Sequence, residues 1–143
     1  MSQPRIPQET RQLVRQRAGG CCEYCRVPEW VGFQDHHVEH IVPRRHGGTS
    51  GAANLALACG PCNWAKGTDL TAFDPVSRRV TRLFHPRQQT WSDHFAFAGL
   101  RIQPLSRTGR ATARHLEFNR PDRIALRRAQ IRCGPLDTNL PPL

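Results

Sequence analysis

Apolar residues recur at helical spacing near the start of the chain and gather in short strand-like runs further along. The spacing over residues 6–18 predicts a helix, which Gly19-Gly20 would end. Residues 33–43 have the pattern of a strand that enters a turn, and the run Leu55–Ala58 has that of a short buried strand. Residues 60–67 fit a short helix. The first half of the chain is therefore predicted to hold a helix followed by a strand, a loop, a second strand and a second helix.

The composition changes after Thr68, where prolines, arginines and aromatic residues become interspersed. Short alternating runs predict one or two β-hairpins over residues 73–105. Two helices follow, one over residues 108–118 with Thr108 as its cap and one that opens near Pro121 and runs to about Arg132. We therefore expect an α+β protein with four parts: an N-terminal helix (1–20), a compact module (21–68), an extension of hairpins and two helices (69–133) and a poorly ordered Pro-rich tail (134–143).

The charge of the chain points to a polyanionic partner. Its 143 residues include 21 Lys and Arg against 11 Asp and Glu, which gives a formal net charge of +10. Such a charge attracts nucleic acid first and an anionic membrane second. No stretch approaches the roughly 18 apolar residues that span a bilayer, so we expect a nucleic-acid partner and no membrane. A genome biased towards arginine is the alternative explanation of the charge.

The composition also limits the core and indicates a compartment. Apolar residues make up 38% of the chain and the mean hydropathy is −0.58, so the core is expected to be modest. A bound metal would help such a chain to fold. The N-terminus lacks the apolar region of a secretory signal, so we expect a cytoplasmic protein whose thiols stay reduced.

Four cysteines form two Cys-x-x-Cys pairs, Cys22 with Cys25 and Cys59 with Cys62. Zinc prefers tetrahedral thiolate coordination, and each such turn supplies two sulfurs without strain. Thirty-three residues separate the pairs, so the zinc would tie together the two ends of an inserted module. Redox-active or merely buried cysteines are the alternative. Cys21 and Cys133 fall outside the pattern.

The segment between and after these pairs carries several further motifs in a fixed order. They are His37-Val38-Glu39-His40-Ile41-Val42-Pro43, Gly47-Gly48, Asn54-Leu55, Asn63 directly after the second pair, and Lys66 three residues later. Together with the cysteines, these motifs resemble the HNH endonuclease family, in its zinc-stapled branch with the ββα-metal fold. The resemblance covers residues 22–67. The last letter of the family name falls on Asn63, so the chain resembles the HNN variant.

The resemblance implies a role for each residue that matches the family motif. His40 corresponds to the general base, and Asn54 to the residue that holds the loop orienting this imidazole. Glu39 and Asn63 correspond to ligands of a divalent cation, with His37 as a further ligand. An acidic and an amide ligand suit Mg²⁺ or Mn²⁺, and His37 would also admit Ni²⁺ or Zn²⁺. Strict alternation along a strand would send Glu39 and His40 to opposite sides, so we predict an irregular backbone there.

Substrate contacts are expected from basic residues beside these positions. Lys66 corresponds to the family's phosphate-proximal lysine, and Arg44 and Arg45 follow the strand that carries the base. Arginines also crowd the last predicted helix, where they face either DNA or solvent; they are Arg123, Arg127, Arg128 and Arg132. The resemblance therefore implies a metal-dependent endonuclease that cleaves DNA, most readily double-stranded DNA.

Two other functions remain open on the sequence. A non-catalytic zinc-stapled nucleic-acid-binding domain would keep the fold and the charge without turnover. A structural or interaction protein would carry its basic charge incidentally, and steep salt dependence of DNA binding would argue against it. Oligomeric state is not indicated by the sequence.

Overall fold

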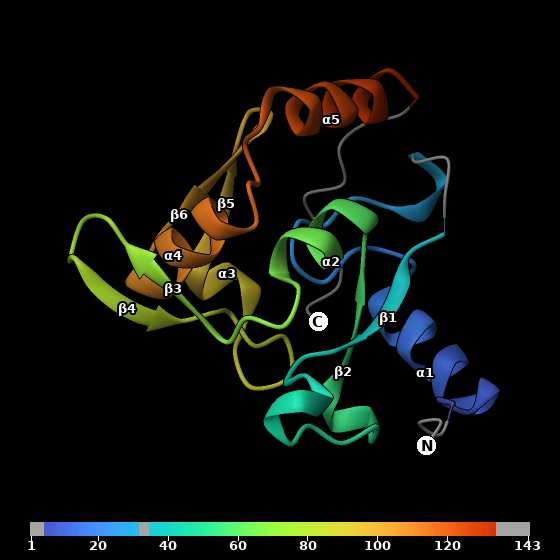
Figure 1. The fold of residues 1–143 in the computed structure, drawn as a ribbon. Coiled ribbons are helices and arrows are strands. Elements are labelled where there is room, and N and C mark those ends of the chain that lie inside the picture. Colours follow the sequence, from blue (N-terminus) through green and yellow to red (C-terminus); the bar gives the residue numbers. More distant parts are fainter. Residues whose placement is uncertain (1–4, 32–34, 134–143) are drawn as a thin grey trace.

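The computed structural model describes residues 5–31 and 35–133, with side chains as far as Gln130 (Figure 1). Several predictions fall partly or wholly outside the described residues: the start of the N-terminal part (1–20), the beginning of the strand predicted over 33–43, the side chain of Arg132 and the Pro-rich tail at 134–143. Over residues 5–31 and 35–133 the fold is mixed α+β, with three separate two-stranded antiparallel sheets. Among the described residues, no helix has the length and apolar character needed to cross a membrane.

The first half of the chain has the predicted order of elements. Helix α1 ends at Ala18, and its last turn is closed by the next residue, Gly19, which has a left-handed backbone (φ 62°). Strands β1 and β2 pair antiparallel, and helix α2 follows β2 directly. The loop between the strands holds two short 3-10 helices. The bounds are α1 (Gln8–Ala18), η1 (Glu29–Val31), β1 (His37–His40), η2 (Arg44–His46), η3 (Ala52–Asn54), β2 (Leu55–Ala58) and α2 (Gly60–Lys66).

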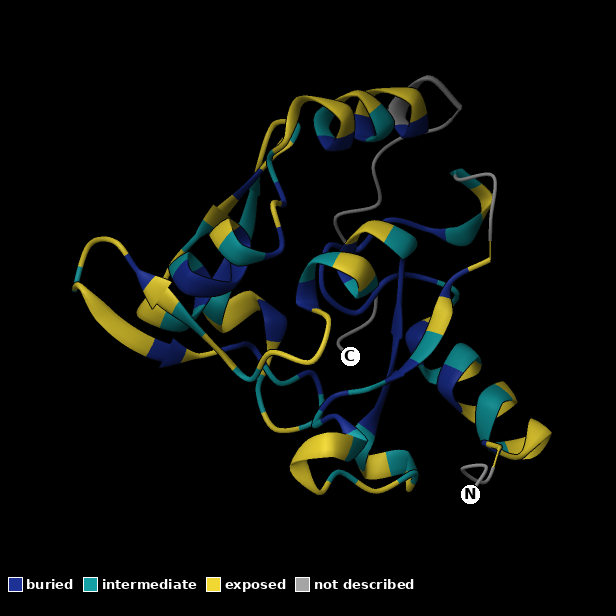
Figure 2. Cartoon of the chain, viewed as in Figure 1, coloured by how far each residue is buried: buried dark blue, intermediate teal, exposed yellow. Residues whose placement is uncertain are grey.

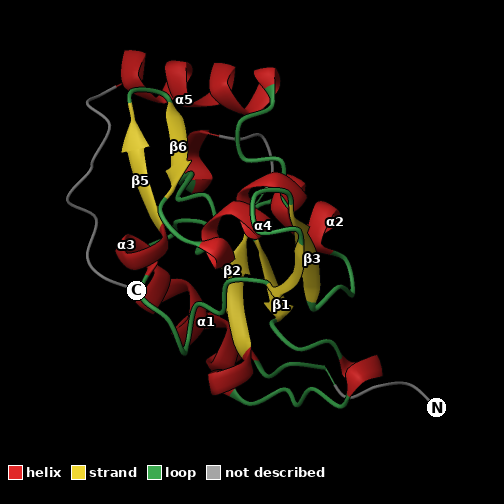
Figure 3. Ribbon diagram, turned by 90° about the vertical axis from the view of Figure 1, so that its left-hand side faces the viewer, coloured by secondary structure: helices red, strands yellow, loops and turns green. Residues whose placement is uncertain are grey.

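The extension contains two hairpins, as the alternating runs predicted, and then two long helices. The bounds are β3 (Thr71–Asp74), β4 (Arg79–Arg82), α3 (Trp91–His94), β5 (Phe95–Ala98), β6 (Arg101–Pro104), α4 (Arg107–His115) and α5 (Pro121–Cys133). The predicted cap of α4 was wrong by two residues. Ser106, not Thr108, caps this helix, because its hydroxyl accepts a hydrogen bond from the Gly109 amide at 2.9 Å. Helix α5 begins at Pro121 as predicted and lies across the tip of the β5–β6 hairpin (Figure 3).

Strand β2 is buried along its whole length and separates two apolar clusters (Figure 2). Leu55 and Leu57 pack with α1, whereas Ala56 and Ala58 pack with the cysteines and the extension. Successive side chains of a strand point to opposite faces, which accounts for this division. The larger cluster joins the Cys-x-x-Cys turns to the extension through a set of aromatic residues: Tyr24, Phe84, Trp91, Phe95 and Phe118.

The irregular backbone predicted at Glu39 and His40 is absent. Each residue of β1 pairs with one residue of β2, from His37 opposite Ala58 to His40 opposite Leu55. The two-stranded sheet leaves the other edge of β1 unpaired. Side chains from both faces of a strand can border a groove along such an open edge, so no bulge is required.

Candidate active site and zinc centre

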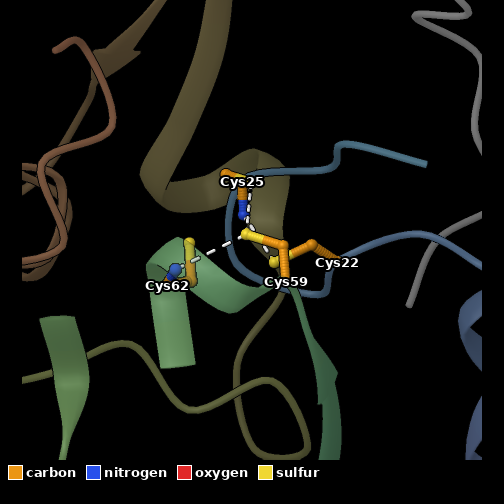
Figure 4. Close-up of side chains that lie close together, drawn as sticks. All are labelled: Cys22, Cys25, Cys59 and Cys62. Atoms are coloured by element: carbon orange, nitrogen blue, oxygen red, sulfur yellow. Dashed lines mark hydrogen bonds between the residues drawn. The ribbon is translucent and has the colours of Figure 1, made fainter. Parts of the chain in front are cut away.

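Four buried sulfurs meet where the turn after α1 approaches the start of α2 (Figure 4). The sulfurs of Cys22, Cys25, Cys59 and Cys62 all lie within 4.8 Å of one another, and Cys25 Sγ is 3.6 Å from Cys59 Sγ. A zinc ion with Zn–S bonds of about 2.3 Å would hold its four sulfurs about 3.8 Å apart. None of the five described cysteines forms a disulfide. The cluster therefore fits a zinc ion, and the predicted set of four ligands lies together.

Backbone amides prepare both turns for thiolates. The Cys25 amide donates to Cys22 Sγ at 3.4 Å, and the Cys62 amide donates to Cys59 Sγ at 3.5 Å. Cys59 is the N-cap residue of α2, and its sulfur accepts the hydrogen bond that caps the first turn of the helix. These bonds stabilise negative charge on sulfur, which is the form that binds a metal.

An open groove of about 400 Å³ runs along the unpaired edge of β1 and the side of α2. It brings together most of the residues that sequence reasoning selected, with carboxylate, imidazole, amide and guanidinium groups among them. The selected residues that line it are His37, Glu39, His40, Arg44, Arg45 and Asn63. Among the described residues, the four cysteines form the one group of three or more His, Cys, Asp and Glu side chains close enough to share a metal. A cation in the groove would therefore rely on Glu39 together with the Asn63 amide.

Glu39 is 7% exposed and is held from two sides. The Tyr24 hydroxyl donates to one carboxylate oxygen, and Lys66 Nζ lies 3.5 Å from the other. Burial raises the pKa of Glu39, while Lys66 and Tyr24 oppose the rise. Tyr24 belongs to the first Cys-x-x-Cys turn. The cysteine cluster and the groove are thus connected by the hydrogen bond from Tyr24 to Glu39, a contact that no sequence pattern indicates.

His40 is held by Ser50 from the loop between the two strands. Its Nε2 lies 3.0 Å from Ser50 Oγ, and Arg44 Nη2 donates to the same oxygen at 2.5 Å. Partial burial lowers the pKa of His40, and the charges of Arg44 and Lys66 lower it further. Both effects favour the neutral imidazole, which is the protonation state of a base.

Asn54 fastens the two ends of this loop together. Its Oδ1 accepts from the Val42 amide at 2.9 Å, and its Nδ2 donates to the carbonyl oxygens of Val42 at 3.0 Å and Thr49 at 2.7 Å. Gly48 permits the close approach, because a Cβ there would lie 1.7 Å from the Val42 oxygen. The loop that carries Ser50 is therefore fixed relative to the strand that carries His40.

A comparison with known protein families finds a match in this part of the chain. Residues 22–69 match the HNH endonuclease family. This HNH segment contains the four cysteines and every selected residue that lines the groove. No curated protein gives a significant match to the chain, and no solved structure does either.

Lys66, the predicted phosphate contact, does not line the groove. It is 2% exposed, and its Nζ donates to the Ile41 carbonyl at 2.9 Å in addition to its ion pair with Glu39. The expected position beside a phosphate therefore does not match this arrangement. A buried ammonium needs a counter-charge, and the only lysine of the chain finds one in Glu39.

Two of the arginines on the last helix, Arg123 and Arg127, are also buried and do not face solvent. Arg127 donates to the carbonyl oxygens of Leu100 and Phe118. Arg123 donates to Cys62 Sγ at 3.0 Å. Arg128 is exposed. Sequence position alone could not separate these cases, because the charge run gives no sign of which residues turn inward.

Replacing Lys66 with methionine is expected to lower the free energy of unfolding by about 3 to 5 kcal/mol, because it leaves the Glu39 carboxylate buried without its counter-charge. Urea denaturation followed by circular dichroism would measure the loss. The matched control is the double variant Lys66→Met with Glu39→Gln, which removes both charges and should recover most of the stability. A Lys66→Met variant as stable as the wild type would show that the ion pair does not form.

The lowered pKa of His40 sets an expected pH dependence for the nuclease activity that the family match suggests. Because the pKa of the imidazole is lowered, by burial first, its midpoint should fall below the ordinary value of about 6.5. We expect the nicking rate to rise with pH and to level off above that midpoint, since only the neutral imidazole accepts a proton. Arg44→Gln should move the midpoint upward by removing one repulsive charge. Rates measured at constant cation concentration would show a midpoint above about 6.5 if this assignment is wrong.

Proposed function

We propose that the HNH segment is a metal-dependent endonuclease that hydrolyses phosphodiester bonds of double-stranded DNA. The observation that supports this most is the shared groove, where an imidazole, a carboxylate and an amide lie beside two arginines. The family match to residues 22–69 supports a nuclease or nucleic-acid-related function. The net charge of +10 favours a polyanionic substrate.

His40 is the general base of the proposed reaction. In the tautomer that the proposal requires, Nε2–H donates to Ser50 Oγ, which lies 3.0 Å away, and the lone pair is on Nδ1. Nδ1 takes a proton from water as the water oxygen bonds to phosphorus, and the bond from phosphorus to the 3′ oxygen breaks. The departing oxygen takes a proton from solvent, which leaves 5′ phosphate and 3′ hydroxyl ends. Ser50 and Asn54 keep the imidazole in one orientation through this step.

A divalent cation is part of the proposal, and Mg²⁺ or Mn²⁺ suits the donors best. Glu39 and Asn63 would hold it, with His37 at the start of β1 as a further donor. Bound there, the cation would supply positive charge to the phosphate oxygens and the leaving group. Arg44 and Arg45 lie in the same groove and would bind the flanking phosphates.

One observation favours the non-catalytic alternative. The Glu39 carboxylate is already paired with Lys66 and Tyr24, so a cation would have to compete with an ammonium group for it. A domain that used this ion pair only for stability would still present a basic groove to DNA. The two functions differ in whether cation-dependent cleavage occurs.

Nicking of supercoiled plasmid tests the proposal directly. The zinc-loaded protein is incubated with plasmid in Mg²⁺, in Mn²⁺ or in EDTA, and the His40→Ala variant purified in the same way controls for a contaminating nuclease. We expect nicked and linear plasmid with the wild type in at least one cation and none in EDTA. DNA binding in a gel-shift assay without nicking in any cation would support the non-catalytic domain instead.

A further inference from the structure

The strongest unexplained feature outside the groove is the buried guanidinium of Arg123 on helix α5. It is 4% exposed, and it lies 61 residues after the cysteine that it contacts. Its Nη2 donates to Cys62 Sγ at 3.0 Å and lies 3.8 Å from Cys59 Sγ. The remaining described acceptor is the Leu116 carbonyl oxygen, at 3.1 Å. A residue from the end of the chain therefore contacts the zinc-binding sulfurs.

Charge explains why an arginine belongs at this position. A buried guanidinium is costly unless an opposite charge accompanies it. No carboxylate of the described residues forms an ion pair with Arg123, so the sulfurs supply that charge. Four thiolates around one zinc ion carry a net negative charge, which a buried cation at hydrogen-bond distance would neutralise in part.

We propose that Arg123 holds helix α5 onto the zinc centre, so that retention of zinc and docking of this helix depend on each other. Arg123 is a positioning residue in this proposal: it donates to the zinc-bound thiolates of Cys59 and Cys62 and stabilises their charge. Zinc loading, in turn, keeps these sulfurs as thiolates and so provides the acceptor that α5 requires. The proposal concerns the zinc centre alone and does not depend on nuclease activity.

Helix α5 supplies its own control. Arg127, one turn further along, is equally buried at 3% exposure but donates to carbonyl oxygens of Leu100 and Phe118. Arg127→Gln should therefore loosen the packing of α5 without removing a donor from sulfur. Arg128 is exposed, so Arg128→Gln should change neither the packing of α5 nor the hydrogen bonds to sulfur.

The first measurement is zinc affinity, by competition with a chromophoric chelator, in Arg123→Gln, Arg123→Lys, Arg127→Gln and Arg128→Gln. Loss of a partner that hydrogen-bonds a metal ligand typically weakens metal binding about 10- to 100-fold. We expect a loss of this size in Arg123→Gln and a smaller loss in Arg123→Lys, which keeps the charge but not the fork of donors. Arg128→Gln should match the wild type, and Arg127→Gln should lose much less than Arg123→Gln.

The second measurement detects the sulfur contact itself and does not rely on stability. Replacing zinc with Co²⁺ gives a sulfur-to-cobalt absorption band, whose energy reports the charge on the thiolates. We expect this band to move to longer wavelength in Arg123→Gln and in Arg123→Lys, and to move much less in Arg127→Gln, because the Arg127 charge lies near the sulfurs but donates its hydrogen bonds to carbonyl oxygens. The proposal is overturned if Arg123→Gln and Arg127→Gln lose zinc equally and neither moves the band. If Arg123→Gln does not fold, the band of Arg123→Lys decides in the same way.

Discussion

Replacing His40 with alanine is expected to slow plasmid nicking by about 10²- to 10⁴-fold, which is the usual contribution of a positioned general base. The reason is local: His40 is the imidazole that Ser50 orients beside the groove. DNA binding should stay close to that of the wild type, because the alanine removes a neutral side chain and leaves Arg44 and Arg45 in place. The two readouts are initial nicking rates and gel-shift affinity.

The Ser50→Ala variant provides a graded test of the same assignment. It keeps the imidazole but removes the oxygen that holds Nε2 at 3.0 Å, so its nicking rate should lie between those of His40→Ala and the wild type. Equal nicking by His40→Ala and the wild type would contradict the assignment of the base. A loss of binding in His40→Ala would instead mean that the groove itself had changed shape.

Removing a zinc ligand is expected to have the largest effect on the fold. Structural zinc contributes apparent binding free energies of roughly 10 to 16 kcal/mol in small domains, which is as large as the whole stability of a typical domain at about 5 to 15 kcal/mol. We therefore expect Cys62→Ser to lose zinc and cooperative unfolding together. The sulfur of Cys62 also accepts the Arg123 bond, so the change should release α5 as well. Thermal melts and metal analysis would measure both effects.

Cys21→Ser is the matched control for this change. Cys21 is buried beside Cys22, but its sulfur is not among the four that cluster. We expect this variant to retain one zinc ion per chain and to melt cooperatively. If chelator-treated Cys62→Ser melts as cooperatively, and at the same temperature, as the zinc-loaded wild type, the cluster does not hold the fold together.

The elements that rest on local pattern were predicted well from the sequence. The glycine pair that ends α1, the apolar run of β2 and the proline that opens α5 all act within a few residues. The cap of α4 was placed wrongly because Ser106 and Thr108 are both suitable capping residues, and only the path of the β6–α4 connection selects Ser106. The regular pairing of β1 was missed because the prediction required Glu39 and His40 to share one face, whereas they share an open edge.

The sequence by itself was sufficient to select residues that the structure brings together: the four cysteines that lie within 4.8 Å of one another, and the histidine, acid and amide that line one groove. Spacing suffices for these because short turns and a hairpin bring them together. Only the tertiary structure decided the partners of the buried charges. Lys66 pairs with Glu39, and Arg123 reaches the sulfurs from the far end of the chain. The physical reason is that a buried charge is placed by the counter-charge that packing brings to it, and such long-range contacts leave no periodic or local signal in the chain.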